Sequence, residues 1–148
     1  MNNTKENNSI EKLDILYNIE GLSPDKKLIL IALGKIAIEK KIITFDDLIR
    51  MCNISKETVL KHLNFFRWLG WFKKRVAVKD GMDVEVNSLN IEFIKECVET
   101  FKHDGIEFAN VEFLFDYLYK YDKAKVTERC PYSPSSNTEE SNESVGEK

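Results

Sequence analysis

Between Thr44 and Leu69, apolar side chains recur every three or four positions, and the period then changes to two. The first pattern indicates amphipathic helix, and the second indicates a half-buried β-strand. Thr44 and Ser55 are N-cap residues for two expected helices, over about 45–52 and 56–69, because a hydroxyl at that position accepts an otherwise unpaired backbone amide. Apolar positions of the second helix form one stripe, so its other face is polar.

The alternating stretch predicts a β-hairpin. Residues 71–78 and 82–88 are separated by Lys79-Asp80-Gly81, and Asp-Gly is a strong signal for a hairpin turn. Asn53 tolerates a left-handed backbone and predicts a tight turn between the two preceding helices. We therefore expect two helices joined by a tight turn and followed by a hairpin.

The segment before this unit is expected to support it. Ser23 and Pro24 start a helix over about 24–40, whose apolar residues cover much of its circumference, as in a central buried helix. Gly34 weakens this helix by about 1 kcal/mol relative to alanine, which indicates a close contact with a neighbour. The short β-branched stretch 42–44 predicts a single strand.

We predict a mainly α fold with a small β-hairpin, in the α+β class. The expected division is a disordered N-terminus at 1–8, an accessory helix at 9–21, a central domain at 22–89, C-terminal helices at 90–126 and a disordered acidic tail at 127–148. The tail is rich in Ser, Asn and Glu and lacks an apolar run, so it cannot offset its ordering entropy.

The C-terminal helices are expected over about 91–102, with Asn90 as cap and Gly105 as stop, and over about 111–123. The second is so aromatic that its apolar surface exceeds what one packing seam needs. We therefore expect it to contact both its own domain and a second copy in a homodimer. The predicted dimer-interface residues are Val111, Leu114, Phe115, Leu118 and Tyr121. The alternative is burial in the chain's own core alone.

Charge is unevenly distributed, although the net charge is only −3. Residues 55–79 carry seven basic residues against the single acidic Glu57, a net charge of +6. A basic stripe confined to one helix and its adjoining strand is the electrostatic footprint of a duplex-binding face. The alternative is a solvated charged face.

The segment SKETVLKHLNFFRWLGWF, residues 55–72, resembles the recognition helix of ArsR/MarR-type winged-helix repressors, in which Ser-x-x-Thr-Val-x-Arg-His-Leu-x-x-Leu-x-x-Ala-Gly-Leu-Val is a common pattern. The matches by identity are Thr58, Val59, His62, Leu63 and Gly70, and those by type are Lys61, Phe66, Trp71 and Phe72. The resemblance covers roughly residues 23–89 and implies a winged helix-turn-helix with N- and C-terminal helical extensions and a DNA-binding ancestry. It departs from the family in the bulk of Trp68, Trp71 and Phe72 and in lacking a sensor metal cluster.

Together these features predict a sequence-specific double-stranded DNA-binding protein, a homodimeric transcriptional regulator whose helix at 56–69 enters the major groove. The predicted DNA-binding residues are Ser55, Lys56, Glu57, Thr58, Lys61, His62, Asn64, Arg67, Lys73, Lys74, Arg75 and Lys79. One alternative is a winged-helix protein-interaction module in a replication, partition or transcription assembly, with a protein partner bound through the C-terminal helix or the acidic tail. A further option is self-inhibition by the tail on the basic face.

Residues that carry reaction chemistry are sparse. Cys52, Cys97 and Cys130 are an odd set without paired spacing, which indicates reduced thiols rather than a zinc site. His103 is expected at a helix end, where a cation favours the helix dipole. We predict no enzyme activity, no cofactor and no metal. No apolar run approaches the roughly 20 residues of a membrane span, and the start lacks a signal-peptide core, so we expect no membrane contact and a cytoplasmic, nucleoid-associated protein.

Overall fold

The computed structural model describes residues 11–39 and 44–134, with only the backbone at 73–75 and 85–87. In chain order its elements are α2 (Pro24–Glu39), α3 (Phe45–Cys52), α4 (Lys56–Leu69), β1 (Phe72–Lys79), β2 (Met82–Leu89), α5 (Ile91–Asp104), α6 (Phe108–Tyr121) and the 3₁₀ helix η1 (Lys123–Thr127). Residues 11–17, within the predicted accessory helix, are helical. The predicted class is confirmed, because the described chain is mainly helical with a two-stranded antiparallel sheet.

Two sequence predictions concern residues outside the described part of the chain. These are the disordered N-terminus at 1–8 and most of the short strand at 42–44. Both stay predictions.

The ends of α3 and α4 are fixed by side chains, as predicted. Thr44 Oγ1 accepts the Asp47 amide at 3.2 Å and Asp47 Oδ2 accepts the Thr44 amide at 3.2 Å, so a capping box is complete. The backbone hydrogen bond from Thr44 lowers the pKa of the Asp47 carboxyl. Asn53 has a left-handed backbone with φ of 56°, and Ser55 accepts the Thr58 amide at 3.2 Å. Local hydrogen bonds therefore define the turn between the two helices.

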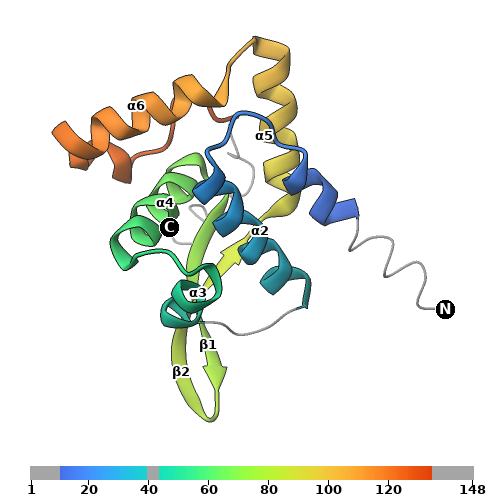
Figure 1. The fold of residues 1–148 in the computed structure, drawn as a ribbon, viewed down its shortest axis with the longest axis vertical. Coiled ribbons are helices and arrows are strands. Elements are labelled where there is room, and N and C mark those ends of the chain that lie inside the picture. The colour runs from blue at the N-terminus through green and yellow to red at the C-terminus, as the bar shows by residue number, and fades with distance from the viewer. Residues whose placement is uncertain (1–10, 40–43, 135–148) are drawn as a thin grey trace, which may run out of the picture.

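The hairpin has the predicted turn but starts one residue later than predicted. Its register runs from Phe72 opposite Leu89 to Lys79 opposite Met82. Asp80 and Gly81 have φ of 56° and 79°, the two positive values that a type I′ turn requires. The hairpin projects away from the helices (Figure 1).

Trp71 was predicted to open the first strand, and this was wrong. The Trp71 indole is fully buried, and its ring centroid is 5.6 Å from that of Phe66. The backbone carbonyl of Trp71 accepts the Asn90 amide at 2.8 Å. Trp71 therefore belongs to the core at the base of the hairpin, and the strand begins at Phe72.

Helices α2 and α4 supply the centre of the core. Ile29 and Leu30 of α2 and Phe65 and Phe66 of α4 are fully buried. A Cβ added to Gly34 would clash with the Leu16 side chain, which packs directly on this glycine. The predicted central place of α2 and the close contact at Gly34 are both confirmed.

Helix α6 crosses above α4 (Figure 1) and covers one of its sides. Phe115 is fully buried, and its ring centroid lies 5.2 Å from Phe65 and 5.4 Å from Trp68. The helix spans Phe108–Tyr121 rather than the predicted 111–123, because Asp122 leaves the helical conformation. Part of the aromatic surface of α6 is thus buried against its own chain.

Disorder was predicted from Thr127 onward, and for residues 127–134 this was wrong. The Cys130 amide donates to the Trp68 carbonyl at 2.9 Å, and Ser133 Oγ donates to the Leu69 carbonyl at 3.0 Å. The Cys130 side chain is buried in the core. A few anchoring contacts therefore order a segment whose composition indicated disorder. Residues 135–148 lie outside the described chain.

Candidate nucleic-acid interface

Helix α4 has one narrow strip of side chains that faces solvent. Lys56, Leu60 and Arg67 are exposed and Asn64 is half-buried, with exposed Glu57 at the edge of the strip. Spacings of four, four and three residues place the first four on one line along the helix. Arg67 donates a hydrogen bond to Asn64 Oδ1. The strip combines a cation at each end with an amide and an apolar side chain between them.

Leu60 was missing from the predicted contact residues. In the sequence an apolar residue on a helix is assigned to the core, yet Leu60 is 40% exposed. A solvent-facing leucine beside polar residues is suited to apolar contact, for example with a methyl group of a base. Helical spacing was the signal that could have found it, because Leu60 falls four residues after Lys56 and four before Asn64, on the polar line of the helix.

The other predicted α4 residues point away from this strip. Lys61 Nζ is 3.1 Å from the Asp116 carboxylate and 5.9 Å from the Tyr119 ring centroid, so Lys61 faces α6. Thr58 is half-buried, and its Oγ1 accepts a hydrogen bond from Ser55 Oγ at 2.8 Å. Ser55 and Thr58 thus act first as capping residues of α4.

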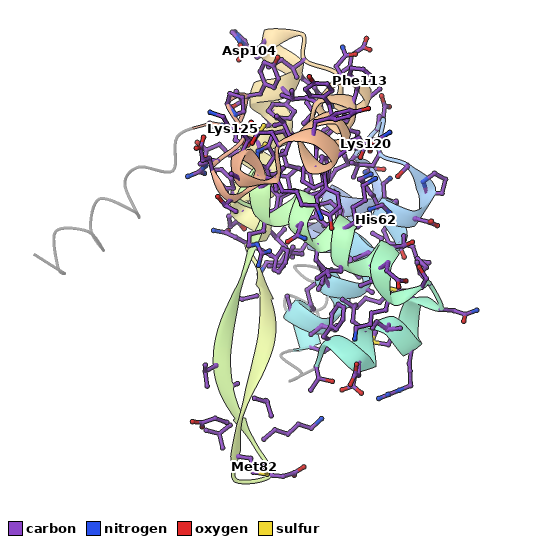
Figure 2. All side chains as sticks on the ribbon, turned by 90° about the vertical axis from the view of Figure 1, so that its left-hand side faces the viewer. His62, Met82, Asp104, Phe113, Lys120 and Lys125 are labelled. Atoms are coloured by element: carbon purple, nitrogen blue, oxygen red, sulfur yellow. The ribbon has the colours of Figure 1, made fainter. Side chains whose placement is uncertain are left out.

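His62 was predicted to contact DNA, but its side chain is only 8% exposed. It lines a separate cleft of about 790 Å³ beside the start of α2, and its place on α4 is labelled in Figure 2. Burial, reinforced by the positive charge of Lys26, lowers the pKa of His62 to about 4. The imidazole is therefore neutral at pH 7 and structural, so the prediction of a phosphate contact is corrected.

Among the predicted DNA-binding residues of the hairpin, only Lys79 has a side chain that the structure describes. Lys79, near the tip, is exposed, and its Nζ lies 4.0 Å from Asp47 Oδ2. Side chains of Lys73, Lys74 and Arg75 lie outside the described part of the hairpin, so their predicted roles stay predictions. Exposed Asp80 and Asp83 also lie at the tip, and the side chains of Val76, Val78 and Met82 are more than 60% exposed. Met82 lies at the far end of the hairpin (Figure 2).

A cleft of about 1060 Å³ opens beside the C-terminal half of α4. Asn64 and Arg67 line it from α4, and Lys123 and Arg129 line it from the segment after α6. The first residues of α5 also contribute to its wall. Sequence reasoning missed Lys123 and Arg129, because one was placed in a dimerisation helix and the other in a disordered tail.

The predicted dimer residues divide between core and surface. Val111 and Phe115 are fully buried inside the chain, and Leu114 and Leu118 are half-buried against the core, so only Tyr121 of the predicted set is well exposed. The solvent-facing side of α6 instead carries Phe113, Tyr117 and Tyr121, which are 75%, 54% and 64% exposed. The rings of Tyr117 and Tyr121 lie 5.0 Å apart. We name these three residues the aromatic stripe.

The three cysteines are free thiols, and all three are buried, which was not predicted. Burial raises the pKa of the Cys97 thiol to about 11 and also raises the pKa values of Cys52 and Cys130. Within 11–39 and 44–134, no group of three or more histidine, cysteine or carboxylate residues is placed to hold a metal ion. Across the same residues, every helix is too short or too polar to cross a bilayer.

Comparison of the chain with protein-family models, with curated proteins and with solved structures finds no match.

Proposed function

We propose that this chain is a sequence-specific double-stranded DNA-binding protein, a homodimeric transcriptional regulator built as a winged helix-turn-helix. Helix α4 enters the major groove, and the β1–β2 hairpin is the wing beside it. The observation that carries the proposal is the solvent-facing strip of α4, where Asn64 stands between the cations Lys56 and Arg67.

The strip has the chemistry that groove readout requires. Asparagine makes bidentate hydrogen bonds to adenine, arginine to guanine, and an apolar side chain contacts the thymine methyl group. The cations also neutralise phosphates, which supplies most of the sequence-independent affinity. The local net charge of +6 over residues 55–79 supports DNA binding by the same face, even though the whole chain is weakly acidic.

The second subunit is proposed to pack on the aromatic stripe of α6. Three adjacent aromatic side chains on one exposed helix face are unfavourable in water unless a partner covers them. A two-fold axis through this face would bring the same stripe from both copies together, as closed dimers require.

A protein-interaction module is the second candidate function. The exposed Val76, Val78 and Met82 favour it, because apolar side chains near the hairpin tip are better suited to a protein groove than to phosphates. In this alternative the strip of α4 would not bind nucleic acid.

Duplex binding measured by fluorescence anisotropy across a salt series separates the two functions. DNA binding requires affinity that falls with salt by a log-log slope of about −0.9 per neutralised phosphate. Lys56→Gln should weaken binding to all sequences and flatten that slope by about one unit for each phosphate contact removed, so by about two units for a dimer. Asn64→Ala should cost about 1 to 3 kcal/mol on a selected site and little on random DNA.

Lys102→Gln, on the exposed surface of the last turn of α5, is the matched control and should leave the curve unchanged. Undetectable duplex binding at low salt, or identical curves for all three variants, would favour the protein-interaction module.

A further inference from the structure

The cleft beside α4 joins the solvent-facing strip to the end of the chain. We name residues 120–134 the C-terminal arm. Arg67 and Asn64 belong to both the strip and the cleft, and Lys123 and Arg129 of the arm face the same space. A ligand lying along the strip would therefore reach the arm without crossing a gap in the surface.

The arm is held firmly at the C-terminal end of α4. Besides the hydrogen bonds from the Cys130 amide and the Ser133 hydroxyl to the last residues of α4, the Arg129 guanidinium lies 5.1 Å from the Phe93 ring centroid. Lys123 Nζ lies 4.9 Å from the Tyr119 ring centroid. The cations at the cleft are thus presented from a fixed position, which reduces the ordering cost of binding.

Charge in and around the cleft favours an anion. The stretch 120–129 carries four basic residues against Asp122 and Glu128, and Glu128 is already 3.9 Å from Lys125. Cleft-lining cations, Lys12, Arg67, Lys123 and Arg129, outnumber the acidic pair Glu92 and Glu128. The N-terminal turn of the 14-residue α5 also borders the cleft and adds the positive end of its dipole.

We propose that the arm forms a second wall of the DNA site, in which Lys123 and Arg129 contact the phosphate backbone of the strand that borders the groove occupied by α4. The proposal rests on the proposed function. A helix about 10 to 12 Å across fills a major groove about 12 Å wide, so whatever flanks the helix meets a backbone. The arm flanks α4 on the side of Arg67, across the cleft of about 1060 Å³.

Lys123→Gln tests the contact, and Lys120→Gln is the matched control, because Lys120 is an exposed cation of the same arm that does not line the cleft. Each lost phosphate contact should make the fall in affinity between 50 and 200 mM salt about threefold smaller, for every duplex sequence, so the loss from both subunits of a dimer should make it about tenfold smaller. Lys120→Gln should match the wild type. Circular dichroism confirms that the exposed substitutions leave the fold intact.

A second readout does not depend on affinity. All three native cysteines are buried, so a single Lys123→Cys substitution can be labelled selectively with a photo-crosslinker. We expect crosslinks to one backbone region of a bound duplex, and a Lys120→Cys label should give few.

The outcomes distinguish the two proposals. Duplex binding that depends on Lys56 but not on Lys123, with no crosslinks, overturns the arm contact alone. Absence of duplex binding by the wild type overturns the proposed function and the arm contact together. Tighter binding by Lys123→Gln also overturns the arm contact, because removing a cation that contacts a phosphate cannot strengthen binding.

Discussion

Helices α4 and α6 have the same length of 14 residues, are both rich in aromatic side chains and pack against each other through Phe65 and Phe115. Their remaining faces differ. Helix α4 is buried on two sides, and its solvent-facing strip has Lys56 at one end and Arg67 at the other. Helix α6 is buried on one side and leaves three aromatic rings in solvent. The aromatic side chains of α4 therefore belong to a closed core, whereas half of those of α6 lie on an open surface.

The comparison teaches that burial, and not composition, assigns a helix its role. The aromatic residues of α4 stabilise the fold, so its polar strip is free to recognise a ligand. The exposed aromatic residues of α6 contribute little to the fold of one chain, so their stabilising effect depends on a partner.

The largest expected difference is in stability. Phe65→Ala should lower the free energy of unfolding by about 3 to 5 kcal/mol, because it opens a cavity among Phe66, Trp68 and Phe115. Phe113→Ala should change it by less than about 0.5 kcal/mol in dilute monomer, because the ring is in solvent. Urea denaturation at low protein concentration measures both. Equal losses would mean that the two helices do not differ as described.

The next difference concerns self-association. Tyr117→Asp places a charge within the aromatic stripe and should shift the sedimentation mass at micromolar concentration from dimer to monomer, with the melting temperature of the monomer unchanged. Lys102→Asp on α5 introduces the same side chain away from the stripe and should remain dimeric. A wild-type monomer under these conditions would remove the role proposed for α6.

The third difference is a pH dependence that originates on the buried side of α4. The folded-state pKa of His62 is about 4, against an ordinary value of 6.5, so the unfolded chain takes up this proton first as the pH falls. The stability contributed by burying the neutral imidazole is complete above pH 6.5 and is lost between pH 6.5 and 4, by on the order of 1 to 3 kcal/mol.

His62→Gln should flatten the stability curve in that window, measured as the difference from the wild type so that the carboxylates cancel. Parallel curves for the two proteins would show that His62 is accessible to water in the fold. His62 would then be a surface residue of α4.

Local signals predicted the elements well. Thr44, Asn53, Ser55 and Gly70 each act through hydrogen bonds or backbone geometry within a few residues, so the sequence alone located the ends of α3 and α4. The Asp80-Gly81 turn was predicted for the same reason. Local interactions also made the order of helix, turn, helix and hairpin predictable.

Tertiary packing decided what the sequence could not show. Periodicity placed Lys61 outside the main apolar stripe, and His62 was assigned from the resemblance to a recognition helix. Only the position of α6 and of α2 turns both away from solvent. The ordered stretch after Thr127 depends on bonds from Cys130 and Ser133 to residues more than 60 positions earlier. Lys123 faces α4 only because Asp122 ends α6 and reverses the chain.

The central claim is that the exposed strip of α4, rather than the aromatic stripe of α6, faces DNA. Two-dimensional ¹⁵N NMR of the full chain tests it most directly, with a short duplex added at about 50 mM salt and again at about 200 mM. We predict amide shift changes at Lys56, Leu60, Asn64 and Arg67 that shrink at the higher salt, with the amides of Phe113 and Tyr117 unmoved. Shift changes confined to the aromatic stripe, or none on α4 at the lower salt, would contradict the account.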